Sequence, residues 1–566
     1  MNAADWIVDY FIKLGTTDAF GIPGAVFLDL LYAMEKRRPE FTPHLVYHEQ
    51  GGAFAASGYA QTSGKLGVAY GTRGPGFTNM VTGIADAYYD SIPVLFLTAH
   101  SAEMLHPDMR ILNNQEIDTV SIVKNITKFA ARINTLEELK EGLKKACSQA
   151  LTGRKGPVFL DICSKLFSQE LAIQIEDTNT DCINIKIQYD TDLLEAIKAI
   201  KKNLLEAKQP VILIGNGLRN KNDIKSLSLL AEKNHIPVLS SRTAHDILPF
   251  SPMFYGHIGS HATRYSNFIL SKSDLIITLG NRLAFPITSK SFKPLVEKTH
   301  FIRIDIDSAE FKREVPNTEC YKVDLHDLLM DLSALDLNYK DFKLWIKKCN
   351  VLKEKLLQFD KNEVVEKLMI IMSKTDLKFV FVSDVGNNSF WVTNAYAYDN
   401  CKNRILYSGS FGTLGCALPK AIGAYYASNS PVICFVGDQG LQMNSQELEF
   451  IGREKLPISI VILNNNSSGM IKEREDKRFN SKYVHTTLDS GYNCPDFEKL
   501  ANAYGLEYIK YDEKTDVSNL LKKVPSIVEI KISEKLDLYP YLPIGDLCQD
   551  LYPYIDRALY NKLNAL

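Results

Sequence analysis

The chain has 566 residues, of which 45% are hydrophobic and 23% are charged, and its formal net charge is −2 at pH 7. This composition is ordinary for a globular protein, and the length requires about three or four domains. The balanced charge gives no electrostatic case for binding nucleic acid or a membrane surface, and no apolar run reaches the roughly 18 residues of a membrane span. Ten cysteines without metal-ligand spacing, and no secretory leader, lead us to expect reduced thiols in a cytoplasmic protein.

Residues 1–167 alternate between helical and strand patterns. Helices are predicted at residues 3–14, 25–34, 50–63 and 77–88, and strands at 17–20, 45–47, 66–70 and 93–98. This alternation is typical of a doubly wound parallel α/β domain. Glu49 precedes the Ala/Gly-rich helix 50–63, and the tight turn Gly71–Gly76 follows strand 66–70. An acidic residue at a helix start is often only a favourable charge there, so Glu49 alone does not indicate chemistry.

The remaining chain contains two more α/β patterns. Residues 168–190 are predicted to be a linker, 191–335 a central domain with strands at 211–215, 237–240, 275–279 and 301–305, and 336–374 a helical connection. Residues 375–540 form the third domain, and 541–566 a polar tail. The lone Gly215-Asn216-Gly217 in the central domain is weak evidence for a dinucleotide site.

A magnesium and phosphate site is predicted in the third domain. Two apolar runs, 432–436 and 458–463, end in Gly437-Asp438 and in Asn464-Asn465-Asn466, with one helical segment between them. The carboxyl ends of parallel strands share one sheet edge, where ligands bind. Asp438 and Asn465 offer oxygen ligands of the kind that Mg²⁺ accepts while bridging phosphates, and the turn at Gly437 lets N–H groups approach a phosphate. Either tip alone is better explained by an ordinary crossover with polar loops, whereas the pair together favours the site.

This pair resembles the thiamine-diphosphate motif, which begins Gly-Asp-Gly and closes with Asn-Asn, although Gln439 replaces the second glycine and Gly440 follows it. With Glu49 and the GTRGPG turn, the chain resembles, nearly end to end, the acetolactate synthase and benzaldehyde lyase group of thiamine-diphosphate enzymes. The resemblance implies three doubly wound parallel-sheet domains, which bind the pyrimidine (1–167), form the centre (191–335) and bind diphosphate and Mg²⁺ (375–540). It also implies a homodimer or homotetramer with the site at the dimer interface.

The resemblance assigns roles to individual residues. Glu49 falls on the glutamate that hydrogen-bonds the pyrimidine nitrogen N1′, and Gln115 falls on the active-site glutamine. Asp438, Asn465 and the backbone oxygen of Ser467 are implied to hold Mg²⁺. The remaining cofactor-binding positions, among which the Gly412 carbonyl takes the 4′-amino group and Leu414 bends the cofactor, are Val26, Thr72, Pro75, Asn79, Gly386, Asn387, Asn388, Gly412, Leu414, Gly440, Leu441 and Met470.

Departures from the family pattern concern substrate and flavin. Asn114 replaces a bulky aromatic residue before Gln115, and Lys128 lies where the family keeps a lysine. Arg474 replaces a tryptophan of acetolactate synthases, so we expect it to contact an anionic acceptor such as a phosphate or a nucleotide-linked sugar; a plain exposed arginine is the alternative. The stretch Arg282–Pro286 lacks both aspartates and the second arginine of the family's FAD segment, which favours a structural central domain over one that binds FAD.

The predicted activity is decarboxylation of a 2-oxo acid such as pyruvate, followed by transfer of the acyl unit to an aldehyde or ketone. A simple 2-oxo acid decarboxylase or a C–C lyase is the alternative within enzymes. A non-catalytic regulatory subunit and an NAD-binding module are alternatives of other classes. The presence of Glu49, Asp438 and Asn465 together favours an enzyme.

Overall fold

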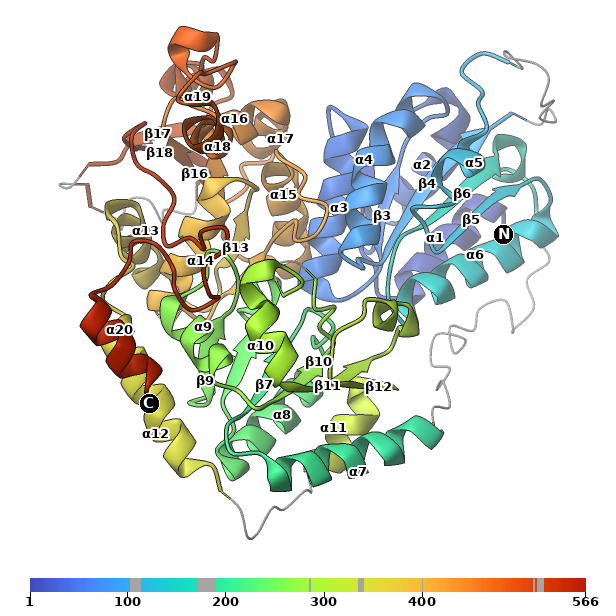
Figure 1. The fold of residues 1–566 in the computed structure, drawn as a ribbon. Coiled ribbons are helices and arrows are strands. Elements are labelled where there is room, and N and C mark those ends of the chain that lie inside the picture. The colour runs from blue at the N-terminus through green and yellow to red at the C-terminus, as the bar shows by residue number, and fades with distance from the viewer. Residues whose placement is uncertain are drawn as a thin grey trace. The chain divides into compact units, whose positions relative to one another are not determined.

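The computed structural model describes residues 1–101, 113–171, 190–284, 287–333, 341–399, 401–512, 515–516 and 524–566. Their strands form three parallel six-stranded sheets with flanking helices (Figure 1), which confirms the predicted α/β fold class. The first and third sheets belong to one compact unit, and the second sheet belongs to another, together with the C-terminal segment.

The first sheet has the strand order β2-β1-β3-β4-β6-β5. Its strands are β1 (Asp18–Gly21), β2 (Thr42–Leu45), β3 (Gly67–Tyr70), β4 (Val94–His100), β5 (Phe129–Ile133) and β6 (Val158–Cys163). Its helices are α1 (Ala3–Lys13), α2 (Leu28–Lys36), α3 (Glu49–Ser63), α4 (Pro75–Tyr89), α5 (Thr119–Val123) and α6 (Leu136–Leu151). Along β4, Val94 and Phe96 enter one hydrophobic core while Leu95 and Leu97 enter another, because successive side chains of a strand point to opposite faces. Both faces of this sheet are therefore buried, which explains its continuous apolar strands.

Strand β2 differs from the sequence prediction, which placed it at residues 45–47. The four residues of β1 pair with Thr42–Leu45, so the pairing ends where β1 ends. Pro43 is tolerated within β2 because β2 is the edge strand of the sheet. The chain then turns at His48, whose ring accepts the Gln50 N–H and caps α3.

The second sheet has the order β12-β11-β10-β7-β8-β9. Its strands are β7 (Pro210–Ile214), β8 (Val238–Ser240), β9 (Phe254–His257), β10 (Leu275–Leu279), β11 (His300–Asp305) and β12 (Thr318–Lys322). Its unit also contains α7 (Asp190–Glu206), α8 (Lys221–Asn234), α9 (Arg264–Ser271), α10 (Lys293–Lys298), α11 (Leu325–Ser333), α12 (Lys343–Leu356), α13 (Glu363–Ser373) and α20 (Arg557–Asn564). The two strands that the sequence did not predict, β9 and β12, are the edges, and β12 carries the polar sequence TECYK.

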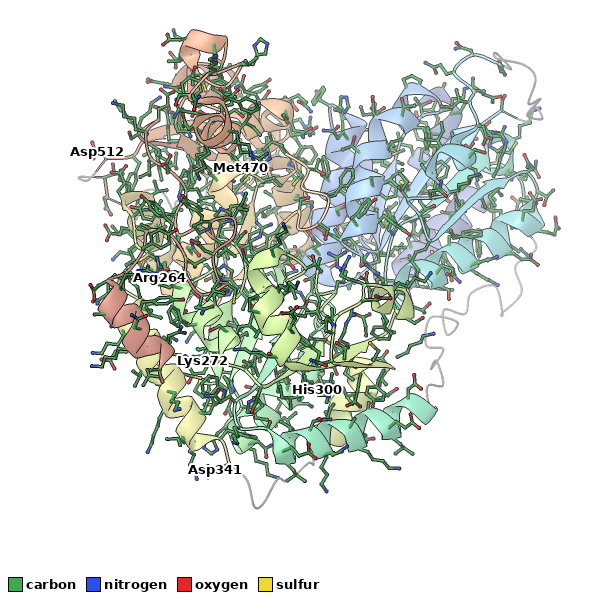
Figure 2. All side chains as sticks on the ribbon, viewed as in Figure 1. Arg264, Lys272, His300, Asp341, Met470 and Asp512 are labelled. Atoms are coloured by element: carbon green, nitrogen blue, oxygen red, sulfur yellow. The ribbon has the colours of Figure 1, made fainter. Side chains whose placement is uncertain are left out.

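A buried arginine fastens the C-terminal segment within this second unit. Arg264 (Figure 2) lies at the start of α9 and donates to Asp360, with an Nη2–Oδ1 distance of 2.7 Å. The same guanidinium donates to the backbone carbonyls of Leu551 and Pro553. Since a buried charge is tolerated only when it is paired and hydrogen-bonded, this network stabilises one arrangement of the segment.

The third sheet has the order β14-β13-β15-β16-β18-β17. Its strands are β13 (Val380–Ser383), β14 (Arg404–Leu406), β15 (Val432–Gly437), β16 (Ile458–Asn464), β17 (Glu507–Lys510) and β18 (Ser526–Lys531). The helices of this part are α14 (Asn387–Tyr398), α15 (Ala417–Ser428), α16 (Asp438–Met443), α17 (Glu447–Arg453), α18 (Gly469–Phe479) and α19 (Phe497–Ala503). Strands β13, β15 and β16 are neighbours, so their polar carboxyl ends meet at one edge.

Helices α3 and α15 bring the first and third sheets together (Figure 1). A Cβ atom on Gly423 of α15 would lie 1.8 Å from the Ala55 carbonyl oxygen, and one on Gly58 of α3 would lie 2.2 Å from the Lys420 carbonyl oxygen. Only glycine permits this backbone approach. The small residues of the predicted helix 50–63 therefore serve helix–helix packing inside a hydrophobic core that both sheets share.

Candidate active site

Glu49 is the first residue of α3, and its side chain is almost buried, with 6% relative exposure. Its carboxylate accepts a hydrogen bond from Asn79 Nδ2 at 2.9 Å. The turn after β3 closes over it, since a Cβ atom on Gly76 would lie 3.0 Å from Glu49 Oε1. The structure thus brings together the predicted catalytic glutamate and Asn79.

The turn after β1 lies against the turn after β3. A Cβ atom on Gly24 would lie 2.5 Å from Thr72 Cβ. Val26 follows in the short 3-10 helix η1 (Ala25–Phe27), and Pro75 is the first residue of α4, where its fixed φ suits a helix start. Thr72, Pro75 and Val26 are therefore grouped at the carboxyl ends of adjacent strands, as the sequence predicted.

Gln115 lies beside the turn that follows β3. A Cβ atom on Gly74, whose φ is +61°, would lie 2.4 Å from the Gln115 carbonyl oxygen. The neighbouring Glu116 is buried, and its Oε1 accepts hydrogen bonds from Arg73 Nη1 at 3.0 Å and from the Ser101 N–H at 2.6 Å. Burial opposes its ionisation, but the hydrogen bonds from Ser101 and the Arg73 guanidinium hold the pKa of Glu116 below its ordinary value.

Arg73 and Glu116 thus fix Gln115 against the turn, and the sequence did not single them out. They lie 43 positions apart, so no local spacing signals the pair. Asn114 is exposed next to Gln115. Lys128 directly precedes β5, and its side chain extends to the carboxyl end of α6. There its ammonium donates to the carbonyls of Gln149 and Thr152, as cations do at helix ends.

On the third sheet, Asp384 follows β13 and is fully buried. Its two carboxylate oxygens accept the Gly415 N–H at 2.9 and 3.0 Å, and a Cβ atom on Gly440 would lie 2.1 Å from Oδ2. Burial raises the pKa of Asp384 to about 7, although the N–H groups of Val385 and Gly415 act in the opposite direction. This carboxylate, which sequence reasoning missed, joins the Gly386–Asn388 segment to Gly415 and Gly440.

The predicted metal ligands gather at the ends of β15 and β16. Gly437 pairs in register with Leu463, so Asp438 and Asn465 follow strand ends that lie side by side. Burial raises the pKa of Asp438, while hydrogen bonds from groups that include the Cys494 thiol and the Asn466 N–H favour its ionised form. Among the described residues, no group of three or more His, Cys, Asp or Glu side chains could hold a metal ion. The predicted Mg²⁺ ligands are instead the carboxylate of Asp438, the side-chain amide of Asn465 and the backbone carbonyl of Ser467.

Unpartnered oxygens at this edge fit a bound cation and phosphate. Asn387 Oδ1 and Ser467 Oγ are buried and have no hydrogen-bond partner in the described part of the chain. A Cβ atom on Gly469 would lie 2.6 Å from Asn465 Nδ2 and 3.3 Å from Asn387 Nδ2, so these two amides adjoin one glycine. Oxygen donors of this kind suit Mg²⁺, and the N–H groups at the start of α16 suit a phosphate.

The other predicted cofactor residues divide into two groups. Gly412, with φ +72°, and the half-buried Leu414 lie on the segment between β14 and α15, and Met470 (Figure 2) is the second residue of α18. Leu441, by contrast, is completely buried in the shared hydrophobic core, so its contacts are those of a packing residue.

Two basic residues of helix α18, Lys472 and Arg474, differ in their exposure. Arg474 is exposed, whereas Lys472 is mostly buried and lies 3.3 Å from Asp476 Oδ2. Glu475 is buried and ties the helix to the following segment, because its carboxylate accepts the Val484 N–H and the Thr486 hydroxyl. Arg474 is therefore available to a solute, and Lys472 is engaged within the protein.

Three family profiles match the chain, all described as thiamine pyrophosphate enzyme domains. They are the N-terminal TPP binding domain over residues 1–122, the central domain over 197–332 and the C-terminal TPP binding domain over 384–530. The chain belongs to the thiamine pyrophosphate enzyme family.

Its relatives are acetolactate synthase large subunits. The chain is 32% identical to that of Lactococcus lactis over 547 residues, which covers 94% of this chain and 93% of the relative. It is 30% identical to the isozyme 2 large subunit of Escherichia coli, covering 96% and 98% of the two chains, and 32% identical to a probable large subunit of Methanocaldococcus jannaschii, covering 96% and 94%. These matches confirm the predicted family. None of the described helices is long and apolar enough to cross a membrane.

The raised pKa of Asp384 predicts a pH-dependent stability. Between the ordinary pKa of 3.8 and the folded value of about 7, the unfolded chain has lost this proton while the folded chain keeps it, so rising pH disfavours the folded state. We expect the free energy of unfolding of the wild type to fall, relative to Asp384→Asn, as pH rises through this range, and to level off above it. Urea denaturation at several pH values measures the difference. The exposed Asp376→Asn is the control, and a parallel profile for both variants would contradict the prediction.

Proposed function

We propose that this chain catalyses the thiamine-diphosphate-dependent decarboxylation of a 2-oxo acid, foremost pyruvate, and joins the acyl unit to an aldehyde or ketone. The observation that supports it most is the presence, in one compact unit, of the Glu49–Asn79 pair and of the oxygen-rich edge at Asp438 and Asn465. Relatives that bear the name acetolactate synthase, aligned over nearly the whole chain, support the same proposal.

Thiamine diphosphate, when bound, supplies the carbon nucleophile that attacks the 2-oxo acid and accepts the electrons released on decarboxylation. Glu49 would hold a proton at the pyrimidine nitrogen N1′, and Asn79 orients that carboxyl group by its 2.9 Å hydrogen bond. The Gly412 carbonyl would take the 4′-amino group, with Leu414 against the bend between the rings. The near absence of water around Glu49 strengthens its hydrogen bonds.

Asp438, Asn465 and the Ser467 carbonyl would hold Mg²⁺, and Asn387 and Asn388 lie where the diphosphate would bind. Their contribution is position rather than proton transfer. Gln115, held by the Arg73–Glu116 pair, would face the substrate, with Asn114 next to it. Lys128 remains a proposed substrate contact only if its ammonium leaves the carbonyls at the end of α6.

The proposal extends to assembly and location. We expect a homodimer or homotetramer in which the site is completed across the dimer interface, in a cytoplasmic protein without nucleic-acid or membrane partners. For the central domain we favour a structural role without FAD. Arg282 belongs to the segment concerned, while Phe285 and Pro286 lie outside the described residues. An absorbance spectrum of the purified protein decides whether flavin is present.

Product analysis tests the proposed reaction. The protein is incubated with pyruvate, thiamine diphosphate and Mg²⁺, alone and with a panel of aldehydes, ketones and phosphorylated or nucleotide-linked sugars, and products are identified by mass spectrometry. We expect carboligation products. Acetaldehyde alone would instead indicate a simple decarboxylase, and no turnover with any acceptor would indicate a non-catalytic subunit.

Replacing Glu49 tests the proton role. Glu49→Gln should lower turnover by about 10²- to 10⁴-fold, the range typical of a lost acid–base group, while thiamine diphosphate affinity changes little. Steady-state kinetics and direct titration of the cofactor measure the two quantities. Glu137→Gln, which removes an exposed acid from the first turn of α6, is the matched control. Equal activity of the two variants would show that Glu49 is only a helix-start charge.

Replacing Arg474 tests the proposed anionic acceptor. A charge-assisted hydrogen bond contributes about 1.5–3 kcal/mol, so Arg474→Ala should raise the KM of a phosphorylated acceptor at least several-fold. The rate of pyruvate decarboxylation should stay near that of the wild type, because Arg474 itself is exposed and is not one of the predicted cofactor-binding residues. Arg478→Ala, on the same helix, is the control. A parallel loss of both reactions would refute the acceptor role.

A further inference from the structure

A buried ion pair joins α4 to α15 close to the predicted cofactor segment. Lys420 and Asp86 are both 0% exposed, and Lys420 Nζ lies 2.8 Å from Asp86 Oδ2. The ammonium also donates to the Tyr407 carbonyl at 3.4 Å. Removing two charges from water is costly unless further hydrogen bonds satisfy them, so the remaining partners of the pair indicate what it does.

The second oxygen of Asp86 holds the two ends of the loop Ser408–Thr413. Asp86 Oδ1 accepts the Ser408 hydroxyl at 2.5 Å and the Thr413 hydroxyl at 2.9 Å. Ser408 Oγ in turn accepts the Thr413 N–H at 3.0 Å, which closes the loop on itself. One carboxylate therefore receives an ammonium and two hydroxyl groups, which an amide with a single acceptor oxygen could not do.

The end of α4 holds the middle of the same loop. Asp90 Oδ2 accepts the Gly409 N–H at 2.6 Å, and Oδ1 accepts the Ser410 N–H at 2.9 Å. The Tyr89 ring stacks on Phe411 with centroids 5.2 Å apart. Gly412 is exposed, like Ser410 and Phe411, and a Cβ atom on it would meet open space.

We propose that Asp86, Asp90 and Lys420 are positioning residues that clamp the Ser408–Thr413 loop so that the Gly412 carbonyl and Leu414 meet the aminopyrimidine of thiamine diphosphate. The loop is bound to Asp86 and Asp90 on both sides of Gly412, and the space around the Cα of Gly412 itself is open. This assignment rests on the proposed function, since it gives the clamped loop a cofactor to hold.

The clamp acts through preorganisation. A loop that is already ordered does not have to be immobilised when the ligand binds, so the affinity is higher. Placement also matters for rate, since a displacement of about 1 Å in a reacting group can cost about 10²-fold. The same helix α4 carries Asn79, the hydrogen-bond donor to Glu49, so one helix positions both Glu49 and the clamped loop of its own chain.

The decisive variant is Thr413→Val, which keeps the side-chain shape and the buried ion pair and removes one hydroxyl from Asp86. Asp86→Asn is less useful because it leaves the Lys420 ammonium buried without a carboxylate partner and is expected to unfold the chain. Thr413→Ser restores the hydroxyl. The matched control is Ser428→Ala, since the Ser428 hydroxyl, at the end of α15, donates to the Ala424 carbonyl and accepts the Ser430 N–H, away from Asp86.

The full-length holoenzyme is measured in three ways: the Kd of thiamine diphosphate at saturating Mg²⁺, the rate of deuterium exchange at the cofactor's C2, and the Tm of the protein without cofactor. We expect Thr413→Val to raise Kd about five- to tenfold, which is the effect of one typical net hydrogen bond, and to slow the exchange, with Tm near the wild type. Thr413→Ser should recover both, and Ser428→Ala should change neither.

Each other outcome has a distinct meaning. Unchanged Kd and exchange in Thr413→Val, with a wild type that binds the cofactor, overturns the clamp and leaves the proposed function standing. A fall in Tm large enough to account for the rise in Kd, or an equal effect of Ser428→Ala on Kd, also overturns the clamp. Either result would assign the hydrogen bonds around Asp86 to folding alone. A wild type that does not bind thiamine diphosphate refutes the proposed function itself.

Discussion

The backbone contact between α3 and α15 is the constraint on which the candidate site depends. Gly58 and Gly423 let the two helices approach until a carbonyl oxygen occupies the space of a Cβ atom. The first and third sheets then share one hydrophobic core. Because α3 begins at Glu49 and α15 follows the Gly412–Leu414 segment, this contact fixes how one chain holds these two segments. A larger side chain at either glycine would separate them.

The buried carboxylates of Asp86 and Asp384 and the half-buried one of Asp90 organise the site around that contact, and each accepts donors from a loop. Asp384 accepts the Gly415 N–H. Asp90 accepts two N–H groups of the Ser408–Thr413 loop, and Asp86 accepts two hydroxyl groups of that loop and the Lys420 ammonium. A carboxylate offers about four acceptor positions, so one side chain can hold several loop atoms at once. Asn387 Oδ1 and Ser467 Oγ, in contrast, have no partner among the described residues and suit a cation or phosphate. The candidate site thus combines loops that are hydrogen-bonded within the protein with two oxygen atoms that could bind a ligand.

The parts of the fold that could be predicted are those with local periodicity. Apolar runs bounded by glycine and asparagine marked β15 and β16, and the rule that parallel strands end at one edge placed Asp438 near Asn465. The edge strand β12 was missed because it is largely solvated and its sequence TECYK is polar, and the edge strand β9 was missed because its four residues are too few to show a period. Strand β2 lies at Thr42–Leu45 rather than at 45–47, because it pairs with β1, and its edge position permits Pro43 within it.

The sequence by itself determined the fold class, the family and the strand ends that carry the candidate ligands, because these follow from spacings of two and 3.6 residues and from short motifs. Only the tertiary structure decided which charged side chains are paired within the protein and which are exposed. Lys128 and Lys472 are engaged by helix carbonyls and by Asp476, whereas Arg474 is exposed. Asp86 pairs with Lys420 across 334 positions, so no local spacing identifies the two residues as partners. Burial arises from packing between distant segments, and local sequence does not encode it.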